Sequence, residues 1–144
     1  MFIFLMSAFL TIGSGESDSK GREKEPDAII DIIAKNDSIA FVEHGKEPGK
    51  HVTVVVGQVV RWVNRDSRAH HVLSAASVGG KRLLDTKAIE PGEHKDVLVD
   101  IDMYKAAGGK PAGVATLNYG CDSGPYDTGK LELLSAAKRG RSIR

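Results

Sequence analysis

The chain has 144 residues, of which 41% are hydrophobic and 27% are charged, and its 20 lysines and arginines nearly balance its 19 aspartates and glutamates. This composition is that of one globular domain, and a net charge of +1 gives no electrostatic footprint for nucleic acid. No stripe of aromatic and basic residues resembles a base-stacking surface, so nucleic-acid binding is not expected. Sixteen glycines and many valines favour strands and turns over helices.

The N-terminus begins with an uncharged run of twelve residues rich in Phe, Leu and Ile. A membrane-spanning helix needs about 20 apolar residues, so this run is too short to be one. Its length is that of the hydrophobic part of a signal peptide, and the small residues at 13–15 suit cleavage, although no basic residue precedes the run. We therefore predict a signal peptide at residues 1–15, export to the periplasm or the cell exterior, and no integral membrane span after cleavage. The alternatives are an apolar N-terminal strand and a wrongly assigned start of the chain.

The rest of the chain is organised as short apolar segments between turns. Residues 16–27 are polar and charged and have no hydrophobic period, which predicts a linker. Residues 103–112 are ambiguous and fit one helical turn, and residues 136–144 form a basic tail. Strands are predicted at residues 28–34, 39–42, 52–56, 59–64, 70–74, 97–101, 114–119 and 130–133. Many short strands without a sustained helical period indicate one all-β domain, a sandwich or a barrel, at residues 28–135.

Cys121 is the only cysteine, so it cannot form an internal disulfide and is a packing residue, a reactive group or a metal ligand. His70 lies about fifty residues upstream, just beyond the strand that contains Trp62. A thiolate and an imidazole that each stand at the end of a strand, where loops cluster, are typical of a copper site. The structural alternative is that Cys121 is a small buried hydrophobe and that His70 is a core histidine bonded to a backbone carbonyl.

The two-residue period of a strand distinguishes the two neighbouring histidines. Val72 must face the core, because the opposite parity would bury Arg68 and expose Val72. His70 has the parity of Val72 and is predicted to point inward, whereas His71 points outward. A one-residue bulge between them would reverse this assignment.

Four short motifs surround these residues. They are residues 56–66 followed by Ala69-His70-His71-Val72, then Glu90-Pro91-Gly92-Glu93, Tyr119-Gly120-Cys121 and Thr128-Gly129-Lys130-Leu131. In order and spacing they resemble the first ligand loop, the PG turn, the Tyr-x-Cys and the final turn of the cupredoxins, the blue-copper family that includes plastocyanin. The resemblance covers about residues 28–135. It implies a Greek-key β-sandwich, one copper ion and one-electron transfer with a redox protein partner.

The ligand pattern departs from the family at two positions. Many cupredoxins read Tyr-x-Cys-x-x-His-x-x-Met-x-Gly, whereas Gly124 stands here at the second His position and Asp127 at the Met position. The resemblance therefore implies His70 and Cys121 as copper ligands and an atypical site. The candidates for a further donor are Asp127, as a hard oxygen ligand, or one of His44, His51, His71 and His94.

Two other functions remain open at this stage. In one of them copper is lost and the fold survives as a binding or structural module. In the other the chain handles copper in the periplasm by holding Cu(I) through His70 and Cys121. Enzyme activity is not expected, because no Ser-His-Asp arrangement, phosphate loop or dinucleotide fingerprint is present.

Overall fold

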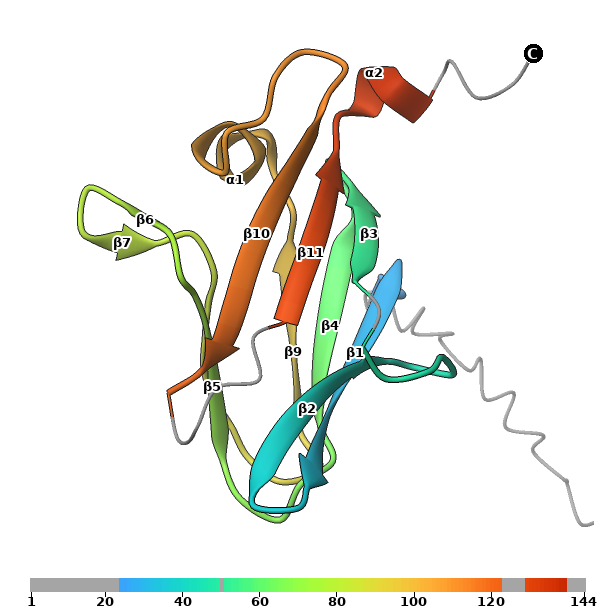
Figure 1. Ribbon diagram of the computed structural model, residues 1–144, viewed down its shortest axis with the longest axis vertical. Helices are drawn as coiled ribbons and strands as arrows, with labels where there is room; N and C mark the ends of the chain where they lie inside the picture. The colour runs from blue at the N-terminus through green and yellow to red at the C-terminus, as the bar shows by residue number, and fades with distance from the viewer. Residues whose placement is uncertain (1–23, 50, 123–128, 140–144) are drawn as a thin grey trace, which may run out of the picture.

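The structure is a computed structural model that describes residues 24–49, 51–122 and 129–139. Figure 1 shows two facing sheets, a small ribbon and two short helices in this part of the chain. The first sheet contains β1 (Ala28–Lys35), β2 (Ser38–Glu43), β4 (Val59–Asn64) and β9 (His94–Leu98). The second contains β3 (Val52–Val55), β5 (His70–Ser74), β8 (Asp85–Ile89), β10 (Val114–Cys121) and β11 (Gly129–Leu134). The ribbon is β6 (Ser77–Val78) and β7 (Lys81–Arg82), and the helices are α1 (Ile101–Ala106) and α2 (Ala136–Arg139).

Each sheet is assembled from distant parts of the chain. The strand order is β2-β1-β4-β9 in the first sheet and β3-β11-β10-β5-β8 in the second. β1 is parallel to β4 and β3 is parallel to β11, whereas the other neighbouring pairs are antiparallel. Two packed sheets with non-consecutive neighbours are typical of a Greek-key sandwich, so the predicted all-β Greek-key sandwich is confirmed.

The core lies between the sheets and is closed by an aromatic pair. Trp62 on β4 and Tyr119 on β10 are 0% and 2% exposed, and their rings meet edge to face with centroids 5.8 Å apart. Ile30 pairs with Trp62 across the parallel β1–β4 ladder and is also fully buried. Each large apolar side chain buried in this way contributes about 1.5–3 kcal/mol to stability. The Trp62–Tyr119 contact therefore helps to hold the two sheets together.

Beyond β9, the structure differs from the sequence prediction. A strand is expected at residues 97–101, but β9 ends at Leu98 and Ile101 begins α1. The reason is Asp100, whose backbone is extended and whose Oδ1 accepts a hydrogen bond of 2.7 Å from the backbone N–H of Met103, as an N-cap does. Residues 97–101, which the sequence pattern predicts as one strand, thus contain the end of β9 followed by the capped start of α1.

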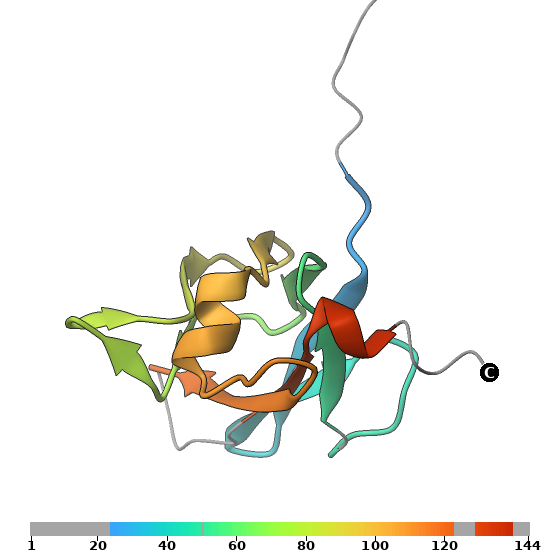
Figure 2. The same ribbon diagram turned by 90° about the horizontal axis from the view of Figure 1, so that it is seen from above.

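The sequence did not predict β8 or the β6–β7 ribbon. β8 has only two buried residues, Thr86 and Ile89, and Lys87 between them has a left-handed backbone with φ of 60°. A strand with that interruption has no alternation of apolar and polar residues to detect. Figure 2 shows that the ribbon projects to the side of the sandwich.

The ends of the chain are described only in part. The predicted signal peptide and most of the predicted linker lie outside the described residues, which begin at residue 24. In the basic tail, residues 136–139 form α2 and the remainder lies outside the described part. Among the described residues, no helix combines the length and the apolar character needed to cross a membrane.

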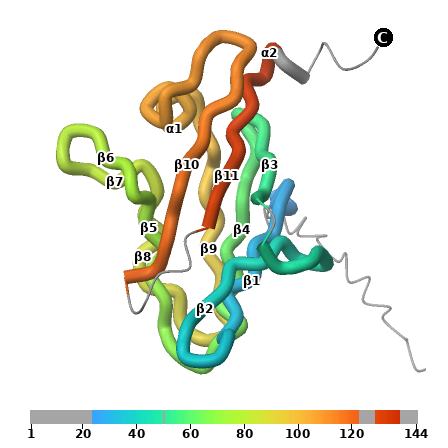
Figure 3. The backbone as a smooth tube through the Cα atoms, viewed as in Figure 1, coloured from blue at the N-terminus to red at the C-terminus, as the bar shows by residue number. Residues whose placement is uncertain are grey.

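The strand β10 runs from the α1 end of the sandwich to the opposite end, and Figure 3 follows it there. Its last residue is Cys121, and one of its two neighbours in the sheet is β5, which begins at His70. Both residues singled out by the sequence therefore stand on adjacent strands.

A first prediction concerns Gly129, which is paired with Tyr119 across the β10–β11 ladder. A Cβ atom at Gly129 would collide with the Tyr119 ring, so the ring or the backbone would have to move. We predict that Gly129→Ala lowers the free energy of unfolding by about 1–3 kcal/mol, as overpacking does. Urea unfolding measures this loss, and the same substitution in a Tyr119→Leu background is the control. The loss should fall by at least half there, and equal losses in both backgrounds would show that no clash exists.

Candidate metal centre

The antiparallel pairing of β5 and β10 brings the two sequence candidates together. Cys121 pairs with Val72, and His70 lies two residues before Val72 on the same inward face. His70 is 2% exposed and Cys121 is 4% exposed, and the His70 Nδ1 atom lies 3.3 Å from Cys121 Sγ. One imidazole nitrogen and one thiol sulfur thus converge inside the sandwich.

The parity argument for the two histidines agrees with the structure. His70 and Val72 are buried, whereas His71 is partly exposed on the outer face. The register of the β5–β8 pair shifts between His71 and Leu73. In this irregular stretch the Val72 N–H bonds to the Thr86 hydroxyl at 3.0 Å. The alternation of β5 itself is kept, so the shift does not turn His70 outward.

A buried carboxylate holds the other side of the His70 ring. Asp66 Oδ2 accepts a hydrogen bond of 2.7 Å from His70 Nε2, and the two side chains are 5% and 2% exposed. Hydrogen bonds from His70 and from the backbone N–H of Ser67 hold the pKa of Asp66 below its usual value. Sequence analysis missed this residue, because an aspartate in a polar turn is ordinary and nothing in its spacing shows that it turns inward.

Asn64 explains why Asp66 points inward. Asn64 is fully buried at the end of β4, and its Oδ1 accepts a hydrogen bond of 2.9 Å from the backbone N–H of Asp66. Its Nδ2 donates to the carbonyls of Arg68 at 2.7 Å and Ile89 at 2.8 Å. A single amide side chain therefore fixes the β4–β5 turn and ties it to the end of β8.

The Asp66 contact also decides the orientation of the imidazole. An ionised carboxylate can only accept hydrogen bonds, so the proton of the neutral His70 ring lies on Nε2. The lone pair of Nδ1 is then directed at Cys121 Sγ. Carboxylates that bond the outer nitrogen in this way are common behind metal-binding histidines, where they fix the tautomer and make the ring a stronger donor.

The spacing of the two atoms fits ligands of one ion. First-row metal bonds of about 2.0 Å to nitrogen and 2.3 Å to sulfur, at a tetrahedral angle, put the two donor atoms roughly 3.5 Å apart. The observed separation of 3.3 Å is close to this value. Thiolate and imidazole together are donors that copper prefers. The part of the chain that the structure describes therefore provides two suitable donors.

The four other histidines lie away from these two donors. His71 lies on the outer face, with Asp85 at 2.6 Å and Asp122 at 3.0 Å. His44 pairs with Asp31 at 2.7 Å and His51 with Glu132 at 3.1 Å, each on an exposed surface, while His94 lies on β9 in the other sheet, paired with Val63.

No third donor is found in the described part of the chain. Among residues 24–49, 51–122 and 129–139, no group of three His, Cys, Asp or Glu side chains is arranged to hold a metal ion. Asp127 and Gly124, which stand at the two variable positions of the ligand pattern, lie outside the described residues.

Comparison with known proteins identifies the architecture. A structure titled as a novel purple cupredoxin from Nitrosopumilus maritimus has a TM-score of 0.50 and 23% identity, and the match covers 74% of this chain and 99% of that one. Two amicyanin structures also match, the Cu(I) form of a methionine-to-alanine mutant and a reduced tryptophan-to-tyrosine mutant. Their TM-scores are 0.51 and 0.50, each at 21% identity, and each match covers 78% of this chain and 86% of the amicyanin chain. The chain has a cupredoxin fold. No family model matches the sequence, and no curated protein is similar to it in sequence.

At this level of identity the likeness to the cupredoxins concerns the fold. The chemistry of the centre has to be argued from the chain's own residues, which are the buried pair His70 and Cys121 and the carboxylate of Asp66 behind them.

A second prediction concerns Asp66 in the metal-free protein. Because its pKa is lowered in the folded state, its contribution to stability is complete above the unfolded value of about 3.9 and is lost as the pH falls below it. Asp66→Asn should lower the free energy of unfolding at pH 7 by about 1.5–3 kcal/mol, the range for a hydrogen bond to a charged group. The difference from the natural protein should shrink below about pH 4.

Urea unfolding between pH 3 and pH 7 measures this dependence. Glu132→Gln, which removes a carboxylate from the exposed pair with His51, is the control and should cost less than 1 kcal/mol. A loss for Asp66→Asn that does not change with pH would contradict the assignment of an ionised carboxylate beside His70.

Proposed function

We propose that this chain is a copper-binding, cupredoxin-like protein that carries out one-electron transfer at an atypical site. The observation that supports the proposal is the 3.3 Å approach of His70 Nδ1 to Cys121 Sγ, with the imidazole held from behind by Asp66 at 2.7 Å. Both ring nitrogens of His70 contact side chains, so its environment differs from that of a core histidine bonded to a backbone carbonyl.

The residues of the chain have distinct parts in this proposal. Cys121 supplies a thiolate and His70 supplies Nδ1, and bound copper would supply the Cu(I)/Cu(II) couple. Asp66 fixes the tautomer and the angle of the ring, so that the nitrogen donor stays in place in both oxidation states. Burial of both donors keeps water and substrate-sized molecules away, which suits electron transfer better than catalysis at the metal.

We propose Asp127 as the third ligand. It stands at the position where cupredoxins often have methionine, six residues after Cys121 and two before Gly129. A carboxylate oxygen is a harder donor than a thioether and stabilises Cu(II) relative to Cu(I), so the reduction potential should be lower than with a thioether.

We further propose that the protein is exported to the periplasm or the cell exterior and exchanges electrons with a redox protein. Support for export comes from the apolar run at residues 1–12 and the small residues after it. In an oxidising compartment a lone cysteine is exposed to oxidation, and both its burial and a bound metal would protect Cys121.

A copper-free binding module is the second candidate. It is favoured by the fact that the described part of the chain contains two donors and no group of three. A related variant of the copper function is the handling of Cu(I), for which a thiolate and an imidazole are suitable donors.

A third prediction separates these functions. One equivalent of Cu(II) added to the metal-free protein should give a thiolate-to-copper absorption band and a Cu(II) electron paramagnetic resonance signal. Cys121→Ser should abolish the band and lower copper affinity at least tenfold, because the soft donor is lost. Tyr119→Phe, two residues away on the same face of β10, is the matched control and should keep the band. If no band forms and Cys121→Ser leaves the affinity unchanged, the protein is a copper-free module.

A fourth prediction tests the third ligand. Asp127→Met should raise the reduction potential of the copper protein, because a soft thioether replaces a hard oxygen donor. Spectroelectrochemical titration measures the shift. Glu132→Gln removes a carboxylate that pairs with His51 on an exposed surface away from the centre, and it should change the potential much less. If both variants shift the potential equally, Asp127 acts only through its charge.

A further inference from the structure

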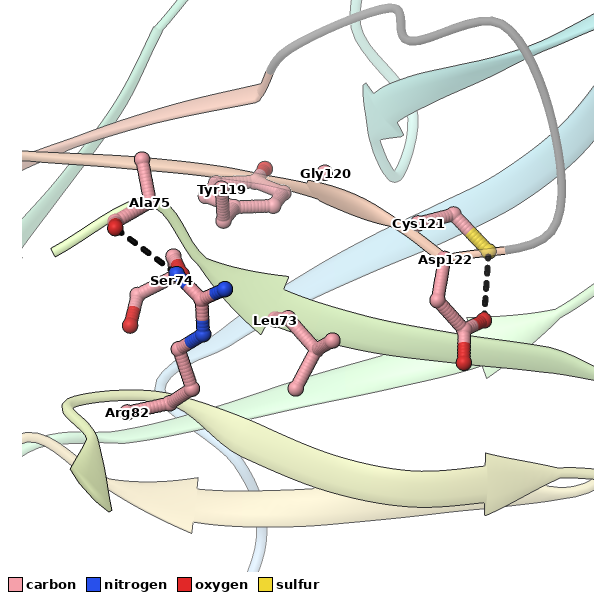
Figure 4. A pocket seen from close by; sticks show the side chains of 8 residues that line it. All are labelled: Leu73, Ser74, Ala75, Arg82, Tyr119, Gly120, Cys121 and Asp122. Atoms are coloured by element: carbon pink, nitrogen blue, oxygen red, sulfur yellow. Dashed lines mark hydrogen bonds between the residues drawn. The ribbon is translucent and has the colours of Figure 1, made fainter. Parts of the chain in front are cut away.

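A pocket of about 400 Å³ lies on the outer face of the β5–β10 pair, directly behind the candidate metal centre. Figure 4 shows Leu73 in the middle of this pocket, with Arg82 of the ribbon at one end and Asp122 at the other. Its walls are mostly apolar. A hollow of this size and character is suited to receive one side chain or a small organic group.

Gly120 brings this pocket close to Cys121. Side chains alternate along β10, so Tyr119 and Cys121 point into the core and Gly120 between them faces outward, opposite Leu73. Because Gly120 has no side chain, the floor of the pocket there is bare backbone, and Cys121 itself lines the pocket. A group in the pocket would therefore be separated from the thiol by a few covalent bonds, although Cys121 is only 4% exposed.

Arg82 provides a fixed positive charge at the rim. Its Nη1 donates to the carbonyls of Ser74 at 3.0 Å and Ala75 at 2.8 Å, which holds the guanidinium in place. The Nε and Nη2 donors make no hydrogen bond to the residues that the structure describes. An arginine side chain is always charged and its planar donors match a carboxylate, so the open side of Arg82 is suited to a carboxylate.

The charges at the two ends of the pocket give a direction to binding. At the far end Asp122 is negative and is already held by His71 at 3.0 Å. The anionic group of a ligand would therefore be repelled by Asp122 and attracted to Arg82. An apolar group of the same ligand would then lie over Leu73 and Gly120. The net charge of +1 gives the whole chain little field of its own, so this local charge sets the preference.

A second hollow of about 330 Å³ between the ribbon and α1 shares Arg82 with the pocket. Its lining is mixed: Val78, which is 58% exposed, and Met103 are apolar, whereas Lys81, Asp100 and Asp102 are charged. Two hollows that meet at Arg82 present more surface than a small molecule would cover. This favours a protein surface as the partner.

We propose that this pocket is the docking point for a carboxylate side chain with an apolar neighbour on a redox partner protein, and that electrons cross to the Cys121 centre through the Gly120 backbone. The proposal rests on the proposed electron-transfer function. The step is the transfer of one electron between the reduced centre and the partner's oxidised centre, and no bond between the two proteins is made or broken.

The first experiment needs no copper. Amide chemical shifts of the ¹⁵N-labelled full chain are followed while two probes are added, pyridine-2,6-dicarboxylate and a capped Gly-Glu-Phe-Gly peptide. Both should shift the amides of Leu73, Ala75 and Gly120, and Arg82→Gln should weaken both effects about tenfold. Lys46→Gln, which removes an exposed cation paired with Glu43, is the matched control and should leave them unchanged. If only the dicarboxylate binds, the pocket is a small-molecule site, and if neither binds, the docking proposal is wrong.

The second experiment measures electron transfer from the Cu(I) protein by stopped flow. The oxidants are an anionic bis(pyridine-2,6-dicarboxylato)cobalt(III) complex and a cationic tris(phenanthroline)cobalt(III) complex, each of which takes one electron and becomes Co(II). Arg82→Gln should lower the rate of electron transfer to the anionic oxidant about tenfold and change the rate to the cationic oxidant less than twofold. Gly120→Leu, which fills the floor of the pocket, should also lower the rate of electron transfer to the anionic oxidant.

The two experiments separate the possible failures. A chain that binds both probes but no copper contradicts the proposed function and leaves the pocket as a carboxylate site. A copper protein on which Arg82→Gln and Lys46→Gln have equal effects shows that only overall charge matters, which would overturn the docking proposal.

Discussion

The β5–β10 ladder is the constraint on which the other features depend. Its register, with Cys121 opposite Val72 and Gly120 opposite Leu73, decides which residues face the core and which face solvent. A slip of one residue would turn Cys121 outward and put Gly120 in its place. The inner face of this ladder holds the thiol and the imidazole, and the outer face forms the pocket. The same pair of strands therefore forms both the buried candidate metal centre and the surface pocket nearest to it.

Much of this arrangement could be predicted from alternation alone. Val72 is apolar and Arg68 is not, which was sufficient to place His70 inside and His71 outside. The role of Asp66 could not be found in the same way, because it depends on how the buried amide of Asn64 bends the turn. The end of β9 was misplaced because the Asp100 cap interrupts an apolar run, and β8 was missed because Lys87 breaks its alternation. In each case a side-chain bond or a backbone angle overrides the local pattern.

Two neighbouring histidines on β5 illustrate how strongly position determines chemistry. His70 lies between a carboxylate and a thiol in the core and has one nitrogen directed at a soft donor. His71, one residue later, lies between Asp85 and Asp122 on the surface and ties β8 and β10 across β5. The first arrangement suits metal binding, whereas the second suits mechanical support. Composition cannot tell them apart, but the two-residue period of a strand can.

The buried amide of Asn64 also has a consequence for how such a centre would be assembled. It bonds Arg68, Ile89 and the Asp66 backbone, and none of these contacts involves a metal. The turn that aims the His70 ring is thus built by protein hydrogen bonds alone. Metal uptake would then be separate from folding, unlike in zinc fingers, where the ion supplies the folding energy. A chain of this design would reach its final shape without a metal ion, and binding or release of an ion would not require unfolding.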